Sequence, residues 1–144
     1  MTDTVQSVEP IVIERVIGAT PEQIYPYLVE ADKLVKWLAI DAETDPRPGG
    51  INHQTHSGPE GDTDGPYFMR GEFTELRPFE FVAFTWGWKD SAMGNLPGSS
   101  NVEVELMPHD DGTLLRLTHS NLTVEGGHRD GWRAMIDKLA ELFN

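Results

Sequence analysis

The 144-residue chain contains no cysteine, which excludes disulfide bonds and thiolate metal ligands. It also has no apolar run near the roughly 18 residues that a membrane-spanning helix needs, so we expect no membrane insertion. The first residues, MTDTVQSVEP, include acids and no apolar stretch, unlike a secretory signal. We therefore expect a cytoplasmic protein, with a flexible tail over residues 1–9 and one domain over residues 10–144.

Basic residues are scarce, with 11 Lys and Arg against 24 Asp and Glu, for a formal net charge of −13. Proteins that bind nucleic acid present clustered Lys and Arg to the phosphates, and a negative field repels them. Because the basic residues here form no run, we expect no nucleic-acid partner. The sequence does not decide between a monomer and a homodimer.

Catalytic and cofactor motifs are absent as well. The chain has no GxSxG elbow, no HExxH pair, no phosphate loop and no GxGxxG fingerprint. Many carboxylates are present, but no spacing singles out a catalytic pair. We therefore assign no catalytic residue and expect no cofactor.

The N-terminal part predicts one strand followed by two short helices. Residues 11–17, IVIERVI, are rich in β-branched residues and predict the strand. Thr20 before Pro21 is typical of a helix N-terminus. Pro26 should shorten or kink that helix, because proline lacks the amide hydrogen of a helix interior. A second short helix is predicted over residues 31–38.

The middle of the chain predicts strands and turns. A strand is expected over residues 51–57 and two hairpins follow, formed by residues 67–78 with 79–88 and by residues 101–109 with 113–122. Long antiparallel strands with helices at both ends indicate an α+β domain.

Residues 126–143 predict a long closing helix with one apolar stripe, formed by Trp132, Met135, Ile136, Leu139, Ala140 and Phe143. Gly131 lies in its first turns, where glycine costs roughly 1 kcal/mol relative to alanine. We expect Gly131 to let a strand or loop approach the helix closely. The alternative is a tolerated glycine near a frayed end.

Four segments in this order resemble the heat-shock-protein ATPase activator homologue branch of the START-like (SRPBCC) superfamily: TPEQIYPYLVEADKLVKWLA, GEFTELRPFEFVAFTW, VEVELMPHDDGTLLRLTH and HRDGWRAMIDKLAELF. The resemblance extends from Ile11 to Phe143. It implies a helix-grip fold, in which a curved antiparallel sheet wraps around a long C-terminal helix and encloses a cavity. Members of the superfamily share no single activity, so the fold does not decide the function.

Aromatic and polar residues near the ends of the predicted elements are candidates to line that cavity. Trp86 and Trp88 share one face of their strand, and His119 falls on the apolar face of its own strand. His119 is either a polar group in a pocket or a hydrogen-bonded core histidine. Arg70 would either anchor an acidic ligand group or pair with a neighbouring acid. The candidate ligand-binding residues are Trp37, Met69, Arg70, Trp86, Trp88, His119, His128 and Trp132.

A metal site is not predicted. His53 and His56 are three residues apart, so on a strand they point to opposite faces, which does not suit one metal ion. We expect both to be exposed to solvent. With Glu60 and Asp62 in the next loop, a zinc site stays open, but no feature of the sequence supports it.

Three functions remain open. The first is binding of a small apolar or amphipathic molecule, whose identity the sequence does not fix. The second is an enzyme of the cyclase or hydratase kind, with His119 or a tyrosine as the acid–base group. The third is an interaction module for stress response or chaperone work. The first two predict an enclosed pocket with convergent polar groups, and the third predicts a filled interior and an exposed apolar patch.

Overall fold

The computed structural model of the protein describes residues 8–58, 63–90 and 94–144. Seven strands form one antiparallel sheet in the order β1-β7-β6-β5-β4-β3-β2. Their bounds are β1 (Ile11–Ile17), β2 (Asp41–Thr44), β3 (Ile51–His56), β4 (Tyr67–Arg77), β5 (Phe81–Trp86), β6 (Ser100–His109) and β7 (Gly112–Ser120).

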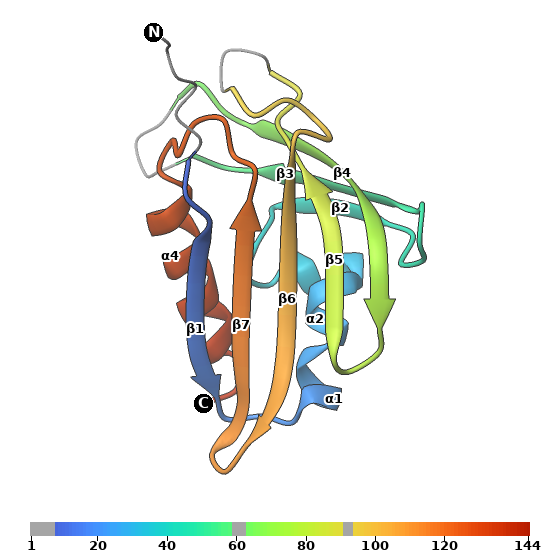
Figure 1. Cartoon of the computed structure of the whole chain (residues 1–144), viewed down its shortest axis with the longest axis vertical. Coiled ribbons are helices and arrows are strands. Elements are labelled where there is room, and N and C mark those ends of the chain that lie inside the picture. Colours follow the sequence, from blue (N-terminus) through green and yellow to red (C-terminus); the bar gives the residue numbers. More distant parts are fainter. Residues whose placement is uncertain (1–7, 59–62, 91–93) are drawn as a thin grey trace, which may run out of the picture.

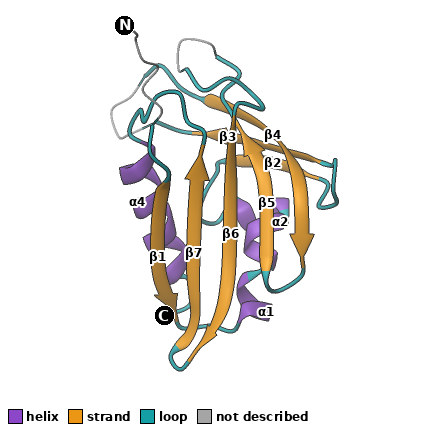
Figure 2. Cartoon of the chain, viewed as in Figure 1, coloured by secondary structure: helices purple, strands orange, loops and turns teal. Residues whose placement is uncertain are grey.

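Four helices accompany the sheet: α1 (Pro21–Ile24), α2 (Pro26–Val29), α3 (Ala31–Leu34) and α4 (His128–Glu141). The sheet curves so that β2 and β3 run across the other strands, and the helices lie on one side of it (Figures 1 and 2). This is the helix-grip fold of the α+β class that the resemblance implied. The described part of the chain contains no helix long and apolar enough to cross a membrane.

The short helices follow from the residues at their starts. The Thr20 hydroxyl accepts the Gln23 amide at 3.2 Å, and the Gln23 side chain accepts the Thr20 amide at 2.8 Å, which closes a capping box. Pro26 begins α2, so one predicted helix becomes two single turns, as expected from its missing amide hydrogen. Helix α3 ends at Leu34, before the predicted boundary at residue 38.

The core lies between the inner face of the sheet and α4. Residues on this face alternate along each strand, as the apolar pattern predicts. The inner residues of the three central strands are Val82, Phe84 and Trp86 on β5, Ser100, Val102, Val104 and Leu106 on β6, and Thr113, Leu115, Leu117 and His119 on β7, all of them buried. From α4, Trp132, Ile136, Leu139 and Ala140 are buried against them.

Gly131 does not contact the body of the protein. It is exposed, and a Cβ atom at this position would meet no heavy atom within 4 Å. The expectation of a close approach is therefore wrong. The physical reason is the helical rotation of about 100° per residue, which moves Gly131 out of the stripe that Trp132 and Ile136 turn inward.

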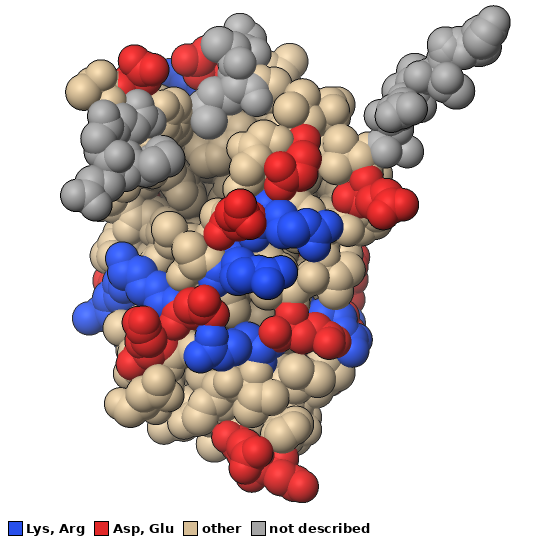
Figure 3. Space-filling model, turned by 90° about the vertical axis from the view of Figure 1, so that its left-hand side faces the viewer, with Lys and Arg blue, Asp and Glu red and all other residues tan. Residues whose placement is uncertain are grey.

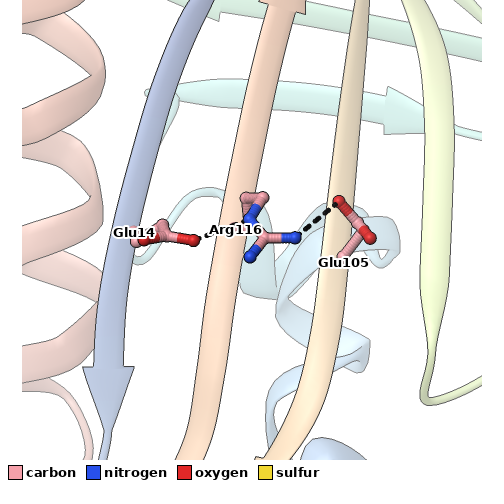
Figure 4. Close-up of polar contacts among 3 residues, drawn as sticks. All are labelled: Glu14, Glu105 and Arg116. Carbon is pink, nitrogen blue, oxygen red and sulfur yellow. Dashed lines mark hydrogen bonds and ion pairs between the residues drawn. The ribbon is translucent and has the colours of Figure 1, made fainter.

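The outer face of the sheet carries charged rows. Arg116 on β7 lies between Glu14 on β1 and Glu105 on β6, with Nε–Oε2 and Nη1–Oε2 distances of 2.6 and 3.7 Å (Figure 4). Phe81 on β5 is nevertheless buried on this face, with the Arg77 guanidinium 4.5 Å from its ring centroid. Strand β5 is thus covered on both faces.

Candidate functional site

Six aromatic side chains meet where β5 and β7 end and α4 begins, at the top of the sheet in Figure 1. Trp86 is central, with ring centroids 5.0 Å from Trp132, 5.5 Å from Trp88 and 5.5 Å from His56. We call this group the ring cluster, and its members are His56, Trp86, Trp88, His119, His128 and Trp132. Five of the eight predicted ligand residues therefore lie together.

His119 is fully hydrogen-bonded within the cluster. The Trp132 indole N–H, which can only donate, binds His119 Nδ1 at 2.9 Å. Ser100 donates its hydroxyl hydrogen to the Trp86 carbonyl at 2.8 Å, so the same oxygen accepts from His119 Nε2 at 2.9 Å. These partners fix a neutral ring with its hydrogen on Nε2. Burial, helped by the nearby His128, lowers the pKa of His119 to about 3.

His128 carries its hydrogen on the opposite nitrogen. The Trp88 indole N–H binds His128 Nε2 at 3.1 Å, and His128 Nδ1 donates to the Glu125 carbonyl at 2.6 Å. The Glu125 carboxylate accepts the amides of Gly127 and Arg129 at the start of α4, which lowers the pKa of Glu125. The first turn of α4 thereby holds the ring of His128 in place.

His56 enters the cluster from β3. Its Nε2 hydrogen bonds to Gln54 Oε1 at 2.9 Å, and Gln54 in turn donates to Asn52 Oδ1 at 3.0 Å. Burial and then the neighbouring His128 lower the pKa of His56 to about 4. The expectation that His56 is exposed is wrong, because β3 turns its polar side chains inward. His53, on the opposite face as predicted, is half-buried beside Arg70.

Three of the predicted site residues lie apart from the rings. Trp37 donates its indole hydrogen to the carbonyl of Tyr27 in helix α2, at 2.8 Å. Met69 is fully buried on β4 and bridges to the backbone of Trp88. Arg70, the next residue, points to the other face of β4, where it donates to the Met69 carbonyl and stacks on Phe68.

Sequence reasoning missed four polar residues around the site: Asn52, Gln54, Asn95 and Ser100, all of them buried. Asn95 joins two loops at this end, because its side chain accepts the Thr123 amide at 2.6 Å and donates to the Val124 carbonyl at 2.8 Å. Only Ser100 had a signal, since it continues the inward alternation of β6. The others lie on polar or turn-rich segments whose orientation the pattern leaves undecided.

The space between α4 and the sheet is nearly filled by side chains. A cavity there offers about 10 Å³ of room, no more than one water molecule needs. Its walls are apolar, and its lining includes Trp37, Phe84 and Trp132. A larger molecule therefore enters this interior only if side chains move.

The described residues contain no group of three or more His, Asp or Glu side chains arranged to hold a metal ion. His53 and His56 diverge across β3, which agrees with the predicted orientation. Glu60 and Asp62, the carboxylates considered with them, lie outside the described residues.

Residues 18–144 match the family model of the Activator of Hsp90 ATPase homolog 1-like proteins. The chain belongs to this family. Among curated proteins, none matches the chain. The recognised branch of the START-like superfamily is thereby confirmed.

Solved structures show the same fold. A Chromobacterium violaceum protein aligns with a TM-score of 0.79 at 23% identity, over 93% of this chain and 96% of its own. A Mesorhizobium loti protein gives 0.77 at 22% identity, with the same two coverages of 93% and 96%. The Aha1 dimer from Colwellia psychrerythraea gives 0.70 at 24% identity, over 94% and 96%. At these identities the likeness shows the fold alone.

Proposed function

We propose that the protein binds a small aromatic or amphipathic molecule at the ring cluster. The observation that carries this proposal is the Trp86 indole N–H, which is buried at the centre of the rings and finds no acceptor among the described residues. A buried donor without a partner costs about 1–3 kcal/mol. A ligand acceptor at this point would remove that cost, and the surrounding rings supply apolar contact area.

The composition of the cluster also favours recognition over packing alone. Three histidines and three tryptophans meet in a region that aliphatic side chains would fill at lower desolvation cost. Binding sites for small molecules combine apolar walls with a few placed polar groups. His119 does not act as an acid–base group in this proposal, because both of its nitrogens are engaged and its pKa lies far below neutrality.

Titration with fatty acids, flavonoids and polyketide-like aromatic compounds tests the proposal, with tryptophan fluorescence as the readout. We expect saturable quenching by at least one class. Trp86→Phe keeps an aromatic ring and should weaken that quenching, whereas Trp37→Phe removes an indole outside the cluster and should leave the affinity unchanged. Native mass spectrometry of the purified protein would show a copurified ligand as a mass increment. The absence of both saturable quenching and a mass increment would contradict ligand binding.

A second candidate is a protein-interaction module related to chaperone work. The filled interior favours it, together with the family match to activators of the Hsp90 ATPase. Leu96 and Val124 are each about half exposed on the two loops that Asn95 joins, so they offer apolar contact area to a partner.

The ATPase rate of a purified bacterial Hsp90, measured with and without this protein, tests the second candidate. Stimulation that Leu96→Ser with Val124→Ser abolishes would support it. The matched control is Val35→Ser, which changes an exposed valine on another surface. An unchanged ATPase rate at saturating protein would contradict it.

A further inference from the structure

Strand β3 directs three polar side chains into the protein interior, which is unusual beside the apolar strands around it. Asn52 and Gln54 are 0% and 1% exposed. Hydrogen bonds join His56 to Gln54 and Gln54 to Asn52. The Asn52 side-chain nitrogen is the last polar atom of this hydrogen-bonded series. That nitrogen is buried and has no acceptor among the described residues. The row therefore ends in an unused donor.

Trp86 Nε1 is a second unused donor on the same face of the sheet. The other three tryptophans all donate, to the Tyr27 carbonyl, to His128 and to His119. Trp86 is as deeply buried as they are, at 3% exposed, and its N–H alone has no partner in the described part of the chain. Two orphaned donors facing one interior indicate an acceptor that belongs there.

The strand register places these two donors in one row. Asn52 pairs with Gly71 on β4. Met69 bridges to Trp88 and Phe73 pairs with Phe84, so Gly71 lies opposite Trp86. Asn52 and Trp86 are thus two strands apart, about 10 Å between their backbones, and the position between them has no side chain. A molecule of two fused rings spans such a distance.

Met69 occupies the space above Gly71. The backbone carbonyl oxygens of Thr85 and Asn52 border the point where a Cβ atom of Gly71 would be, and the Met69 sulfur, 3.3 Å from it, is the side-chain atom among its three nearest neighbours. A methionine side chain is flexible, and its thioether is only a weak acceptor. Its displacement would therefore open the row between the two donors without breaking a strong hydrogen bond.

The local charge selects the kind of acceptor. All Lys and Arg residues of the chain are in the described ranges, and none of them is buried. The indole N–H groups of Trp132 and Trp88 donate to His119 and His128, which leaves one nitrogen of each ring without a hydrogen. Burial lowers the pKa of His56 to about 4. The net charge of −13 repels anions. An uncharged oxygen suits this interior better than a carboxylate, whose burial without a cation is costly.

We propose that the Trp86 indole N–H recognises a carbonyl oxygen of an uncharged aromatic molecule, that Asn52 offers a second donor at the other end of that molecule, and that the Met69 side chain moves to admit it. This inference rests on the proposed ligand-binding function. It adds the chemical class of the ligand and names Met69 as the residue whose side chain moves when the ligand binds. In each of these two contacts the protein N–H group donates and an oxygen of the ligand accepts.

Two probes that differ by one oxygen atom test the inference: 2-acetonaphthone, which has a carbonyl, and 2-ethylnaphthalene, in which a methylene group replaces it. ¹H–¹⁵N spectra of the labelled protein resolve the four indole N–H groups and the Asn52 amide. The ketone should move the Trp86 indole resonance downfield relative to the hydrocarbon, since the ring currents of the two probes match. The ketone should also bind roughly tenfold more tightly, as one hydrogen bond of typical strength allows.

Variants separate the two roles. Trp86→Phe should remove most of the preference for the ketone and leave the affinity for 2-ethylnaphthalene within about twofold. Met69→Ala should strengthen binding of both probes and keep the preference. Trp37→Phe, whose indole is bonded elsewhere, is the matched control and should change neither.

The outcomes distinguish this inference from the proposed function. Saturable binding of both probes with equal affinity and equal shifts would overturn the inference and leave ligand binding standing. Equal binding with water cross-peaks at both the Trp86 indole and the Asn52 amide would assign these donors to structural water and also overturn it. If neither probe nor any compound of the earlier panel binds, the proposed function fails and the inference fails with it.

Discussion

His119 shows how hydrogen-bond partners set the charge of a buried side chain. An indole can only donate, so the bond from Trp132 leaves His119 Nδ1 without a hydrogen. A protonated imidazole would have to break that bond, because both of its nitrogens then donate. Burial acts in the same direction and keeps the pKa of His119 at about 3. The ring is therefore neutral at physiological pH.

This neutrality predicts acid sensitivity. Between pH 6.5 and the folded-state values of about 3 for His119 and about 4 for His56, the unfolded chain binds protons that the folded chain excludes. Stability therefore falls as the pH falls through this window, by about 1.4 kcal/mol per pH unit for each histidine. Urea unfolding of the wild type and of His119→Gln at several pH values between 7 and 4.5 measures the difference in slope.

The control for this prediction is His109→Gln, at an exposed turn. It should follow the wild type, while His119→Gln should lose roughly half of the histidine contribution. Equal pH slopes for the wild type and His119→Gln would contradict the assignment of His119 as a buried neutral group.

Gly131 leads to a prediction of increased stability. Since no atom lies within 4 Å of a Cβ at this helical position, alanine fits without strain. Gly131→Ala should raise the free energy of unfolding by about 0.5–1 kcal/mol. Gly112→Ala should instead lower the free energy of unfolding. Gly112 has a φ of +130°, and a Cβ atom there would collide with the Ile17 carbonyl oxygen. A loss of stability in Gly131→Ala, measured by thermal or urea unfolding, would show a packed position.

The orientation of β3 was the part of the site that sequence could not provide. Alternation correctly separates His53 from His56, but it does not say which of them faces inward. The single apolar residue of the strand, Ile51, lies on the outer face with His53, while the polar row of Asn52, Gln54 and His56 is inside. A prediction from amphipathicity would therefore place Ile51 inside and the polar residues outside, which is the reverse of the structure. The proposed ligand contact Asn52 lies on this strand.

At the scale of elements, strong periodicity was predicted well. Strand β1 and the hairpin of β6 and β7 match the prediction closely, because alternation and a DDG turn define them. Helix α4 begins at His128 and ends at Glu141, each two residues inside the predicted limits. Strand β2, with the sequence DAET, was not predicted, because four mostly polar residues give no strand signal and pairing with β3 forms it.

Helix α4 should depend on its buried stripe. Leu139 is 0% exposed in the core cluster, so Leu139→Ala should lower the free energy of unfolding by about 2–5 kcal/mol. Leu142→Ala, at an exposed leucine one turn away, should cost less than about 0.5 kcal/mol. Chemical denaturation of both variants measures these costs. A cost below about 0.5 kcal/mol for Leu139→Ala would place the stripe in solvent and overturn the packing of α4 on the sheet.

At the scale of the whole molecule, charge limits the partners. The face formed by α4 and β1 carries several Lys and Arg side chains, and Figure 3 shows Asp and Glu side chains interspersed among them. Arg15 pairs with Asp137 there, and Arg116 pairs with Glu14. Two basic residues are thus paired with acids, and further acids lie among the others, so this face does not form a continuous basic patch.

A groove on this face gives the sharpest test of that conclusion. It lies between β1 and α4, has a volume of about 240 Å³, and its charged lining is two acids and two bases: Glu14, Asp137, Arg15 and Arg133. Because the acids and bases of the groove balance, binding there would not compensate a nucleic-acid phosphate for the loss of its hydration. The net charge of −13 also repels the phosphates at longer range. We expect no retardation of DNA or RNA by low-micromolar protein at physiological salt in a gel-shift experiment. Asp137→Asn with Glu14→Gln should leave this result unchanged at that salt, since two charges shift the field only slightly. Retardation by the wild-type protein would require a basic surface that the described residues do not form, and would overturn the exclusion of nucleic acid.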